Sequence, residues 1–523
     1  MIRLLLISAW MSFALGIGPR AQAMPAAWQG APMELDLQGI DFSREGQDLW
    51  RSSIFWNPRN RAGSRLFVEN CPDPRAARVF GLWWWQARGA TDLASFAAAL
   101  EKRRKSTEWL FEKEDKLVVH IAWMPPWLSR SEDRRKLPNE SYEVRNAVGP
   151  RNTEEWKEAV RVFARFVKSC RKDRNCELYY EFWNEPDLMY WQGGVDEFLD
   201  LYAQTVAALR EVDADIEVGG CAANGWRNKL SQKRRGDKPI TQLLIEHCGK
   251  NRVPLDFVSW HWFDYRPKEL EEAARTIRAW SRRSGLAKVP ELLITEWNAP
   301  RVIRDSRYQP FVMADFLLTA RRVGIDIQCM AAWQDFHPEP RSEHYGLVTH
   351  DGRKRTALDV HLAFDAMSRC QGGTYVLRRR SEDDDEGQLR LVLGKEGAGR
   401  YRLLIWRSGQ EPGTVAALRY LRAHGVAAST FQGVFPHEIA AMIGEGTPDR
   451  EEDREAWQQA RKIQAQGKPS GLVISFPGAK TLQVHSARAF LAEPRKLDTR
   501  IVGNRLSLDL QRYELASLRV DIR

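Results

Sequence analysis

The chain has 523 residues, 43% hydrophobic and 28% charged, a composition typical of a soluble globular protein with room for two or three domains. Lys and Arg outnumber Asp and Glu by 79 to 69, so the net charge is a moderate +10. The basic residues are scattered and form no nucleic-acid-binding motif, which argues against nucleic acid as a partner. A field of this size either attracts an acidic polymer or is simply a solvated surface.

The first 23 residues predict a cleaved signal peptide. Arg3 supplies a positive charge, an apolar run extends from Leu4 to Ile17, and Ala21-Gln22-Ala23 fits the A-x-A cleavage pattern. The apolar run is too short for a comfortable membrane span, and the later sequence contains no run of 18 apolar residues. We therefore expect a chain without a membrane span that is exported to the periplasm or to the outside of the cell.

Residues 50 to 335 alternate short apolar runs with amphipathic helical stretches, such as 153–169 and 269–280. Parallel strands need crossover helices, so eight alternations predict a (β/α)8 TIM barrel over residues 45–368. A doubly wound open sheet is the structural alternative, but the sequence lacks its Gly-rich phosphate turn. The candidate strands are 53–57, 77–85, 116–123, 177–183, 215–220, 255–261, 291–296 and 326–333.

The sequence pattern changes after the predicted barrel. Residues 369–523 contain strand-like runs separated by Gly- and Pro-containing turns, which predicts a C-terminal β-sandwich domain. A charged helical insertion interrupts this domain at about 416–466. The segment 33–50 is a candidate for one further strand of the sandwich.

Two glutamates follow apolar strands, and their positions need an explanation. Glu185 follows the run 177–183, and Glu296 ends the run 291–296. A charge at the edge of a core costs free energy unless something there uses it. Side chains at the C-terminal ends of barrel strands face one bowl, so we expect the two carboxyl groups to face each other. Such a pair can hydrolyse a glycosidic bond with retention when roughly 5 to 5.5 Å separates the carboxyl groups.

The stretches around these glutamates resemble clan A glycoside hydrolases, and most closely family 39, the β-xylosidase and α-L-iduronidase family. The resemblance covers roughly residues 75–365 and rests on stretches in family order: YYEFWNEPD, DADIEVGGCA, DFVSWHWF, LLITEWN and HYGLVTHDGRKRTAL. It implies an O-glycoside hydrolase acting by double displacement. The implied substrate is a plant or bacterial saccharide, either β-xyloside-like or uronate-containing.

Position by position, the resemblance implies that Glu185 is the acid/base and Glu296 the nucleophile. Asn184 would hydrogen-bond the 2-hydroxyl of the sugar at the cleavage point, and His261 would touch the nucleophile or the sugar. Trp333 would form an apolar floor beneath the sugar. The chemistry also requires a raised pKa for Glu185 and an ionised Glu296.

Other residues have roles that the sequence leaves open. His120, in the third strand, either reaches the bowl and binds substrate or forms a hydrogen bond inside the barrel. Arg301, Arg304 and Arg307 would pair with the carboxylates of an acidic sugar if they line the cleft. The group His337, Glu339, Glu343 and His344 has no spacing that defines a metal site, so we expect no metal and no organic cofactor.

Alternative functions also stay open. The chain is either an exo-acting glycosidase, an endo-acting polysaccharide hydrolase of the same clan, or a non-catalytic carbohydrate-binding protein on the same barrel. In each case the expected partner is an oligo- or polysaccharide, and the sequence does not indicate an oligomeric state. The 21 Trp residues agree with a saccharide partner because Trp faces pack against sugar rings, although core packing is their commoner role. Among seven Cys, Cys170 and Cys176 bracket a short loop and could form a disulfide in an oxidising compartment.

Overall fold

The computed structural model describes most of the chain from Met33 onward. The predicted signal peptide, residues 1–23, and part of the charged insertion lie outside the described residues. The residues not described are 1–32, 72, 131–145, 230–237, 307, 380–388, 408–411, 427–442, 444–452, 467–471, 491–494, 509–514 and 523.

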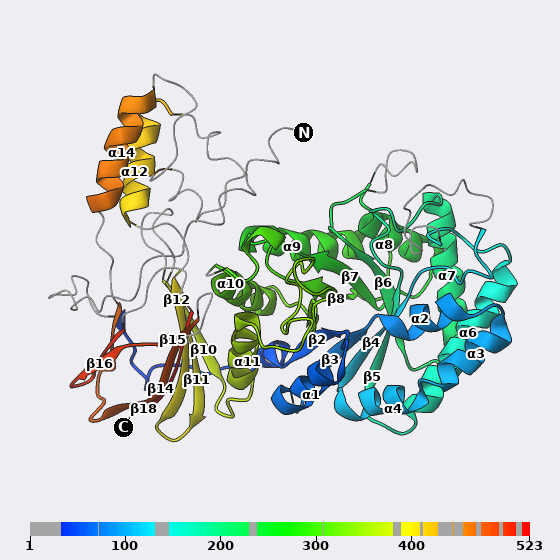
Figure 1. Ribbon diagram of the computed structural model, residues 1–523, viewed down its shortest axis with the longest axis horizontal. Coiled ribbons are helices and arrows are strands. Elements are labelled where there is room, and N and C mark those ends of the chain that lie inside the picture. Colours follow the sequence, from blue (N-terminus) through cyan, green and yellow to red (C-terminus); the bar gives the residue numbers. More distant parts are fainter. Residues whose placement is uncertain are drawn as a thin grey trace.

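Eight parallel strands form a closed barrel, as the alternating pattern predicts (Figure 1). Each strand pairs with the next along the chain, and Ile54 opposite Met330 closes the circle. A barrel strand lies at each of the eight predicted positions, and the predicted ends differ by a few residues except at 77–85. The strands are β2 (Ser53–Trp56), β3 (Ala76–Val79), β4 (Lys116–Ile121), β5 (Glu177–Phe182), β6 (Glu217–Ala223), β7 (Phe257–Trp262), β8 (Glu291–Trp297) and β9 (Ile327–Met330).

Helices surround the barrel and cover its apolar strands (Figure 1). In α6, Asn152 is the N-cap and accepts hydrogen bonds from the backbone of Glu154 and Glu155, while Trp156 and Phe163 are fully buried. This is the amphipathic stripe that the spacing predicts. The helices are α1 (Arg61–Asn70), α2 (Gly81–Gly89), α3 (Leu93–Glu101), α4 (Arg104–Lys113), α6 (Thr153–Arg171), α7 (Val195–Val212), α8 (Ile240–Asn251), α9 (Pro267–Arg283), α10 (Gln309–Arg322) and α11 (Thr356–Ser368).

The second predicted strand, 77–85, is wrong over its second half. Strand β3 ends at Val79 and helix α2 begins at Gly81, so the three consecutive Trp residues lie on a helix. Trp83 and Trp84 are buried, whereas 47% of Trp85 is exposed. Periodicity alone cannot distinguish a short buried helix from a buried strand, because both are continuously apolar.

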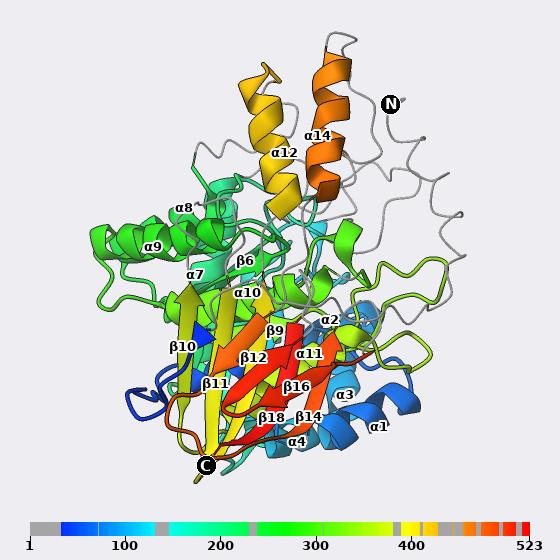
Figure 2. The ribbon, with the colours of Figure 1, turned by 90° about the vertical axis from the view of Figure 1, so that its left-hand side faces the viewer.

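Two separate sheets form the predicted C-terminal β-sandwich (Figure 2). An apolar cluster that includes Leu403, Ile474 and Leu518 draws its residues from both sheets. One sheet has the order β10 (Thr374–Arg379), β11 (Leu389–Gly397), β12 (Arg400–Arg407), β18 (Leu515–Ile522), β14 (Leu482–Phe490) and β15 (Arg495–Lys496). The other has the order β1 (Met33–Glu34), β13 (Leu472–Ser475), β17 (Arg505–Leu508) and β16 (Thr499–Val502).

The N-terminal segment joins the sandwich, as predicted, because β1 pairs in parallel with β13. The sandwich packs on the barrel through Asp315 of α10, which accepts a hydrogen bond from Trp406 at 2.7 Å and forms an ion pair with Arg390 at 2.6 Å. The charged insertion contributes two helices, α12 (Pro412–Ala423) and α14 (Arg454–Gln466). These helices pack against each other and extend away from the sandwich (Figures 1 and 2).

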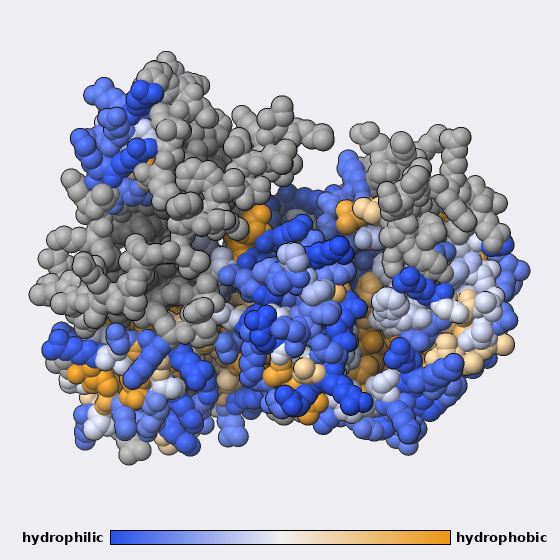
Figure 3. All heavy atoms as spheres, in the orientation of Figure 1, coloured by the Kyte–Doolittle hydropathy of each residue, from blue (hydrophilic) through white to orange (hydrophobic). Residues whose placement is uncertain are grey.

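The surface in Figure 3 is mostly hydrophilic over the barrel helices, with small hydrophobic patches between them. In the part of the chain that the structure describes, every helix is too short or too polar to cross a membrane. All seven cysteines are buried and unbridged, so the proposed disulfide between Cys170 and Cys176 does not form in this structure.

Candidate active site

Glu185 lies in a sharp turn directly after β5. Trp183 and Glu185 have φ angles of 69° and 46°, a left-handed conformation that non-Gly residues seldom adopt. The backbone N–H of Glu185 donates to the carbonyl of Ala222 in β6 at 2.9 Å, which ties the turn to the neighbouring strand. The turn directs the carboxyl group of Glu185 toward the centre of the barrel face, where it meets residues of β6 and β7.

Glu296 lies near the end of β8 and faces the same centre. A single imidazole ring contacts both carboxylates: Nδ1 of His261 lies 3.0 Å from Oε1 of Glu185, and Nε2 lies 3.8 Å from Oε1 of Glu296. The side chains of Glu185 and Glu296 remain 15% and 14% exposed, while that of His261 has no exposed surface. The two glutamates, 111 positions apart in sequence, therefore share one small and partly open site.

Arg78 of β3 holds the floor of this site together. Its fully buried guanidinium donates to Glu181 at 2.6 Å, to Oδ1 of Asn184 at 2.9 Å, and to Oε1 of Glu296. Burial acts to lower the pKa of Arg78, but Glu181 and Glu296 outweigh burial and raise it. Arg78 is therefore a permanent cation placed against the predicted nucleophile.

Asn184 takes part in this arrangement through its oxygen. Because Oδ1 accepts from Arg78, the amide is oriented, and Nδ2 has no hydrogen-bond partner among the described residues. A free donor at this point can bind a sugar hydroxyl. This agrees with the contact that the resemblance implies for Asn184.

Asn224, just after β6, adds a second donor to Glu185. Its Nδ2 lies 2.8 Å from Oε1 of Glu185. Asp187 fixes the loop that carries Asn224 by accepting from the backbone N–H of Asn224 at 2.9 Å and from Asn228 at 2.8 Å. Oε1 of Glu185 thus receives two side-chain hydrogen bonds, from Asn224 and from His261.

The titration of this site differs from the sequence expectation. Burial acts to raise the pKa of Glu185, but hydrogen bonds from His261 and Asn224 and the charge of His261 outweigh burial, so this pKa lies below its usual value. Burial raises the pKa of Glu296, and the charges of His261 and Arg78 offset only part of that effect. The expectation of a raised pKa for Glu185 in the sugar-free site is therefore wrong.

His261 explains this reversal. Burial acts to lower the pKa of His261, but the charge of Glu296 and the hydrogen bond with Glu185 outweigh burial and raise it. A protonated Nδ1 donates to Glu185 and favours its ionised form. The titration of Glu185 therefore depends on the protonation of His261, whose imidazole lowers the pKa of this carboxyl group.

Two predicted contact residues lie elsewhere. Trp333 has no exposed surface, donates from Nε1 to the carbonyl of Gly63 at 2.8 Å, and packs edge-on against Phe67 at 5.2 Å. The expected sugar floor at Trp333 is corrected, because this indole supports α1. His120 is also fully buried, with its ring stacked on Phe80 at 4.7 Å. Burial lowers the pKa of His120 well below its usual value, and Arg78 and His261 add to this, so His120 is a neutral ring inside the barrel.

The two described arginines after β8, Arg301 and Arg304, both contact other protein groups. Arg304 stacks on Tyr345 at 3.8 Å and donates to the carbonyls of Ala299 and Glu343, which is a structural role. Arg301 is 70% exposed and pairs with Glu343 at 3.2 Å. Arg307 lies outside the described residues.

The histidine and glutamate group that follows β9 is held by ion pairs. His344 contacts Asp305 at 2.7 Å and Glu339 at 3.4 Å, and Glu343 pairs with an arginine. Within the described ranges, no three His, Cys, Asp or Glu side chains gather as a metal site requires.

Comparison with known proteins agrees with this geometry. Residues 110–294 match the model of Glycosyl hydrolases family 39. This segment includes Glu185 and His261 but ends two residues before Glu296, and Arg78 precedes it.

Two curated relatives are β-xylosidases. That of Caldicellulosiruptor saccharolyticus is 27% identical over 206 residues, 36% of this chain and 39% of the relative. That of Geobacillus stearothermophilus is 32% identical over 174 residues, 29% of this chain and 32% of the relative. The chain thus matches less than half the length of either relative. A family 39 β-xylosidase structure from Caulobacter crescentus has the same fold, with a TM-score of 0.55, 14% identity, and coverage of 94% of this chain and 100% of that one.

Proposed function

We propose that this chain, in which residues 110–294 match Glycosyl hydrolases family 39, is a clan A O-glycoside hydrolase that cleaves its substrate with retention. The observation that carries the proposal is the contact of one imidazole, His261, with two strand-end glutamates, Glu185 and Glu296. A matched pair of carboxyl groups in one partly open site is what double displacement requires.

In the first step Glu296 attacks the anomeric carbon, and the bond from that carbon to the leaving oxygen breaks. Glu185 protonates the leaving oxygen with the proton that it shares with His261. The product of this step is a glycosyl ester on Glu296 and a free alcohol. Arg78 supports the attack because its guanidinium orients Glu296 and stabilises the carboxylate that leaves in the second step.

In the second step Glu185 removes a proton from water, and the hydroxide oxygen bonds to the anomeric carbon. The ester bond to Glu296 breaks, and the Glu185–His261 pair holds the proton for the next cycle. Asn184 can donate its free amide N–H to the sugar 2-hydroxyl throughout. This contact accelerates the reaction to the extent that it strengthens in the oxocarbenium-like transition state.

Hydrolysis of aryl β-glycosides tests the proposal. The two curated relatives are β-xylosidases, so aryl β-xylosides come first, followed by glucosides, arabinosides and glucuronides. We expect Glu296→Gln to lose at least about a thousandfold in kcat. Glu185→Gln should lose far more on a poor leaving group than on a good one, because only a poor leaving group needs protonation.

Matched controls come from the opposite ends of the same strands. Glu177 begins β5 and Glu291 begins β8, so Glu177→Gln and Glu291→Gln remove a carboxylate without touching the site. Both controls should keep near wild-type rates. Release of oligomers from a polysaccharide, with no cleavage of aryl glycosides, would favour the endo-acting alternative. If Glu296→Gln hydrolysed the same substrates at the wild-type rate, the proposal would be overturned.

A further inference from the structure

A cavity of about 1150 Å³ lies beside the candidate active site, among β2, β3, α1, α2 and α4. Its volume slightly exceeds the roughly 300–1,000 Å³ typical of small-molecule sites. Phe55 and Phe80 form part of its wall, and the Arg78 guanidinium lies 5.6 Å from the centre of each ring. The same guanidinium donates to Glu296, so Arg78 connects this wall of the cavity to the predicted nucleophile.

The cavity also reaches the side of the predicted acid/base. Tyr190, in the loop between Glu185 and α7, lines the cavity and packs on Trp123 at 5.7 Å. Phe336, after β9, also lines it and packs on Phe55 at 5.9 Å. These residues place the cavity next to the candidate active site, on the side where further sugar residues of a bound saccharide would extend.

Tryptophan dominates the wall of the cavity. Trp56 packs against Trp109 at 5.8 Å, and Trp84 packs against Trp123 at 5.2 Å. Trp85 also lines the cavity and is 47% exposed. Broad aromatic faces contact the C–H faces of sugar rings and leave the hydroxyl groups free for water. The five tryptophans of the wall are Trp56, Trp84, Trp85, Trp109 and Trp123.

The charged side chains among the described residues that line the cavity are all arginines. Arg59, Arg65 and Arg103 line it, and its described lining residues include no Asp and no Glu. Arg65 pairs with the exposed Glu69 at 3.4 Å. Arg59 lies over Phe336 at 5.0 Å and Arg103 contacts Gln86 at 3.5 Å, and neither guanidinium has a carboxylate partner among the described residues. These two cations are available to an anionic ligand.

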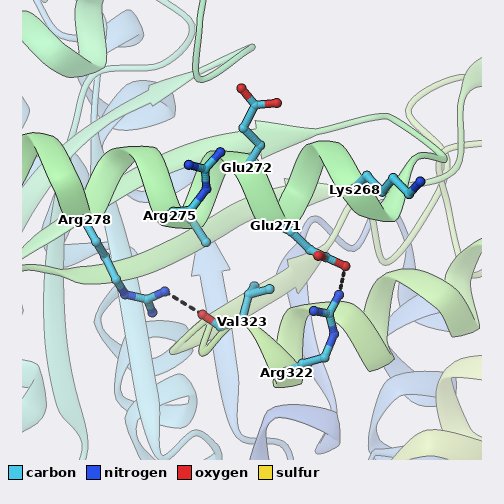
Figure 4. Close-up of a pocket in the computed structure, with 8 residues that line it drawn as sticks. Lys268, Glu271, Glu272, Arg275, Arg278, Arg322 and Val323 are labelled. Carbon is cyan, nitrogen blue, oxygen red and sulfur yellow. Dashed lines mark hydrogen bonds and ion pairs between the residues drawn. The ribbon is translucent and has the colours of Figure 1, made fainter. Parts of the chain in front are cut away.

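A second hollow, of about 570 Å³ between α9 and α10, provides the contrast (Figure 4). Its lining carries both signs of charge and no aromatic ring, and Arg322 pairs there with Glu271 across the two helices. Arg278 donates to the carbonyl of Val323 at 2.6 Å. Arg322 thus has a carboxylate partner within the protein, unlike Arg59 and Arg103.

We propose that the cavity is a binding site for a carboxylate-bearing sugar residue of the substrate, held by Trp85 stacking and by Arg59 and Arg103. The proposal rests on the proposed glycosidase function and narrows its substrate to an acidic oligo- or polysaccharide. The acidic residue lies away from the bond that is cleaved, so the sugar at the glutamates can itself be neutral.

Binding to the Glu296→Gln variant tests the site without turnover. The probes are oligosaccharides of glucuronic, galacturonic and mannuronic acid, each paired with the same oligosaccharide after its carboxyl groups are reduced to alcohols. Calorimetry and tryptophan fluorescence give Kd for each pair. We expect at least one acidic probe to bind about tenfold more tightly than its reduced form at low salt, with the difference shrinking as salt rises.

Arg59→Gln and Arg103→Gln, each made in the Glu296→Gln background, should reduce this preference about threefold to tenfold, and together should abolish it. Arg353→Gln is the matched control, because Arg353 is 73% exposed and pairs with Asp351 at 2.9 Å. Trp85→Ala should weaken acidic and reduced probes alike. Equal binding of every acidic probe and its reduced form, or a preference that survives the double substitution, would overturn the proposal.

The two proposals fail in different ways. The proposed glycosidase function fails if the wild-type chain hydrolyses none of the glycosides or polysaccharides, whatever the binding results are. The proposed acidic-sugar site fails if each acidic probe and its reduced form bind with the same Kd, whether or not the chain hydrolyses neutral glycosides.

Discussion

Nδ1 of His261 lies 3.0 Å from Oε1 of Glu185, so the imidazole and the carboxyl group of the candidate acid/base are within hydrogen-bond distance and can share one proton. The other ring nitrogen faces Glu296 at 3.8 Å. The carboxylates raise the pKa of His261, and His261 in turn lowers that of Glu185. The pair can hold one proton for the leaving group while the nucleophile is ionised.

The pH profile of a His261→Asn variant tests this sharing. In the wild type, His261 is the last group of the site to lose its proton as the pH rises, because its pKa is raised above the usual value of 6.5. Without the imidazole, that proton resides on carboxyl groups, whose ordinary pKa is 4.5. We therefore expect the alkaline limb of kcat/KM to move to lower pH. Movement to higher pH would mean that Glu185 alone carries the proton and that His261 only lowers its pKa.

Arg78→Lys should damage the predicted nucleophile. Lysine cannot reproduce the forked contact with Glu181, Asn184 and Glu296, so kcat/KM should fall roughly a hundredfold or more. Arg78 acts to lower the pKa of Glu296, so weakening the contact should raise that pKa and move the acidic limb of kcat/KM to higher pH. Arg390→Lys, at a buried ion pair with Asp315, is the control and should not move the limb. An unchanged limb in Arg78→Lys would contradict this role.

Asn184→Ala should act through the sugar 2-hydroxyl. The variant should cleave a normal glycoside roughly a hundredfold more slowly, because a hydrogen bond made to the transition state is lost. A 2-deoxy glycoside lacks the partner, so the same substitution should change its rate little. Measuring kcat/KM for both substrates in both proteins gives the coupling. Equal losses on the two substrates would show that Asn184 acts by positioning Arg78.

Trp333→Phe should affect stability more than activity. The substitution removes the hydrogen bond to Gly63 and part of a fully buried ring, a loss of about 1–3 kcal/mol. Activity should stay within about threefold, less than 1 kcal/mol in barrier. Denaturant unfolding and steady-state kinetics check both parts. A hundredfold loss of kcat/KM at unchanged stability would restore Trp333 to the sugar site.

The barrel, the sandwich and the two glutamates follow from sequence patterns. Apolar strands that end in Trp-Asn-Glu-Pro and Thr-Glu-Trp indicate where charge is placed at the edge of a core. The same reasoning could have found Arg78, since it is a lone charge inside the apolar run 77–85. Asn224 has no comparable signal, because a polar residue after a strand is ordinary.

Other features depend on side-chain direction, which the sequence does not specify. Trp333 points to α1 because that helix packs over the end of β9, and this arrangement exists only in the folded barrel. The lowered pKa of Glu185 depends on the approach of His261, which lies on β7, two strands away from β5 in the barrel. The tryptophan cavity was hidden because Trp83, Trp84 and Trp85 looked like a strand and lie on a helix.

Trapping the covalent intermediate is the most direct test of the central claim. A 2-deoxy-2-fluoro glycoside with a good leaving group slows both steps, and the second step more, so the glycosyl ester accumulates. After digestion and mass spectrometry, we predict the label on the peptide that contains β8, at Glu296, and faster accumulation in the wild type than in Arg78→Lys. A label on Glu185, or first-formed products of inverted anomeric configuration from an active enzyme, would contradict the assignment of the two glutamates.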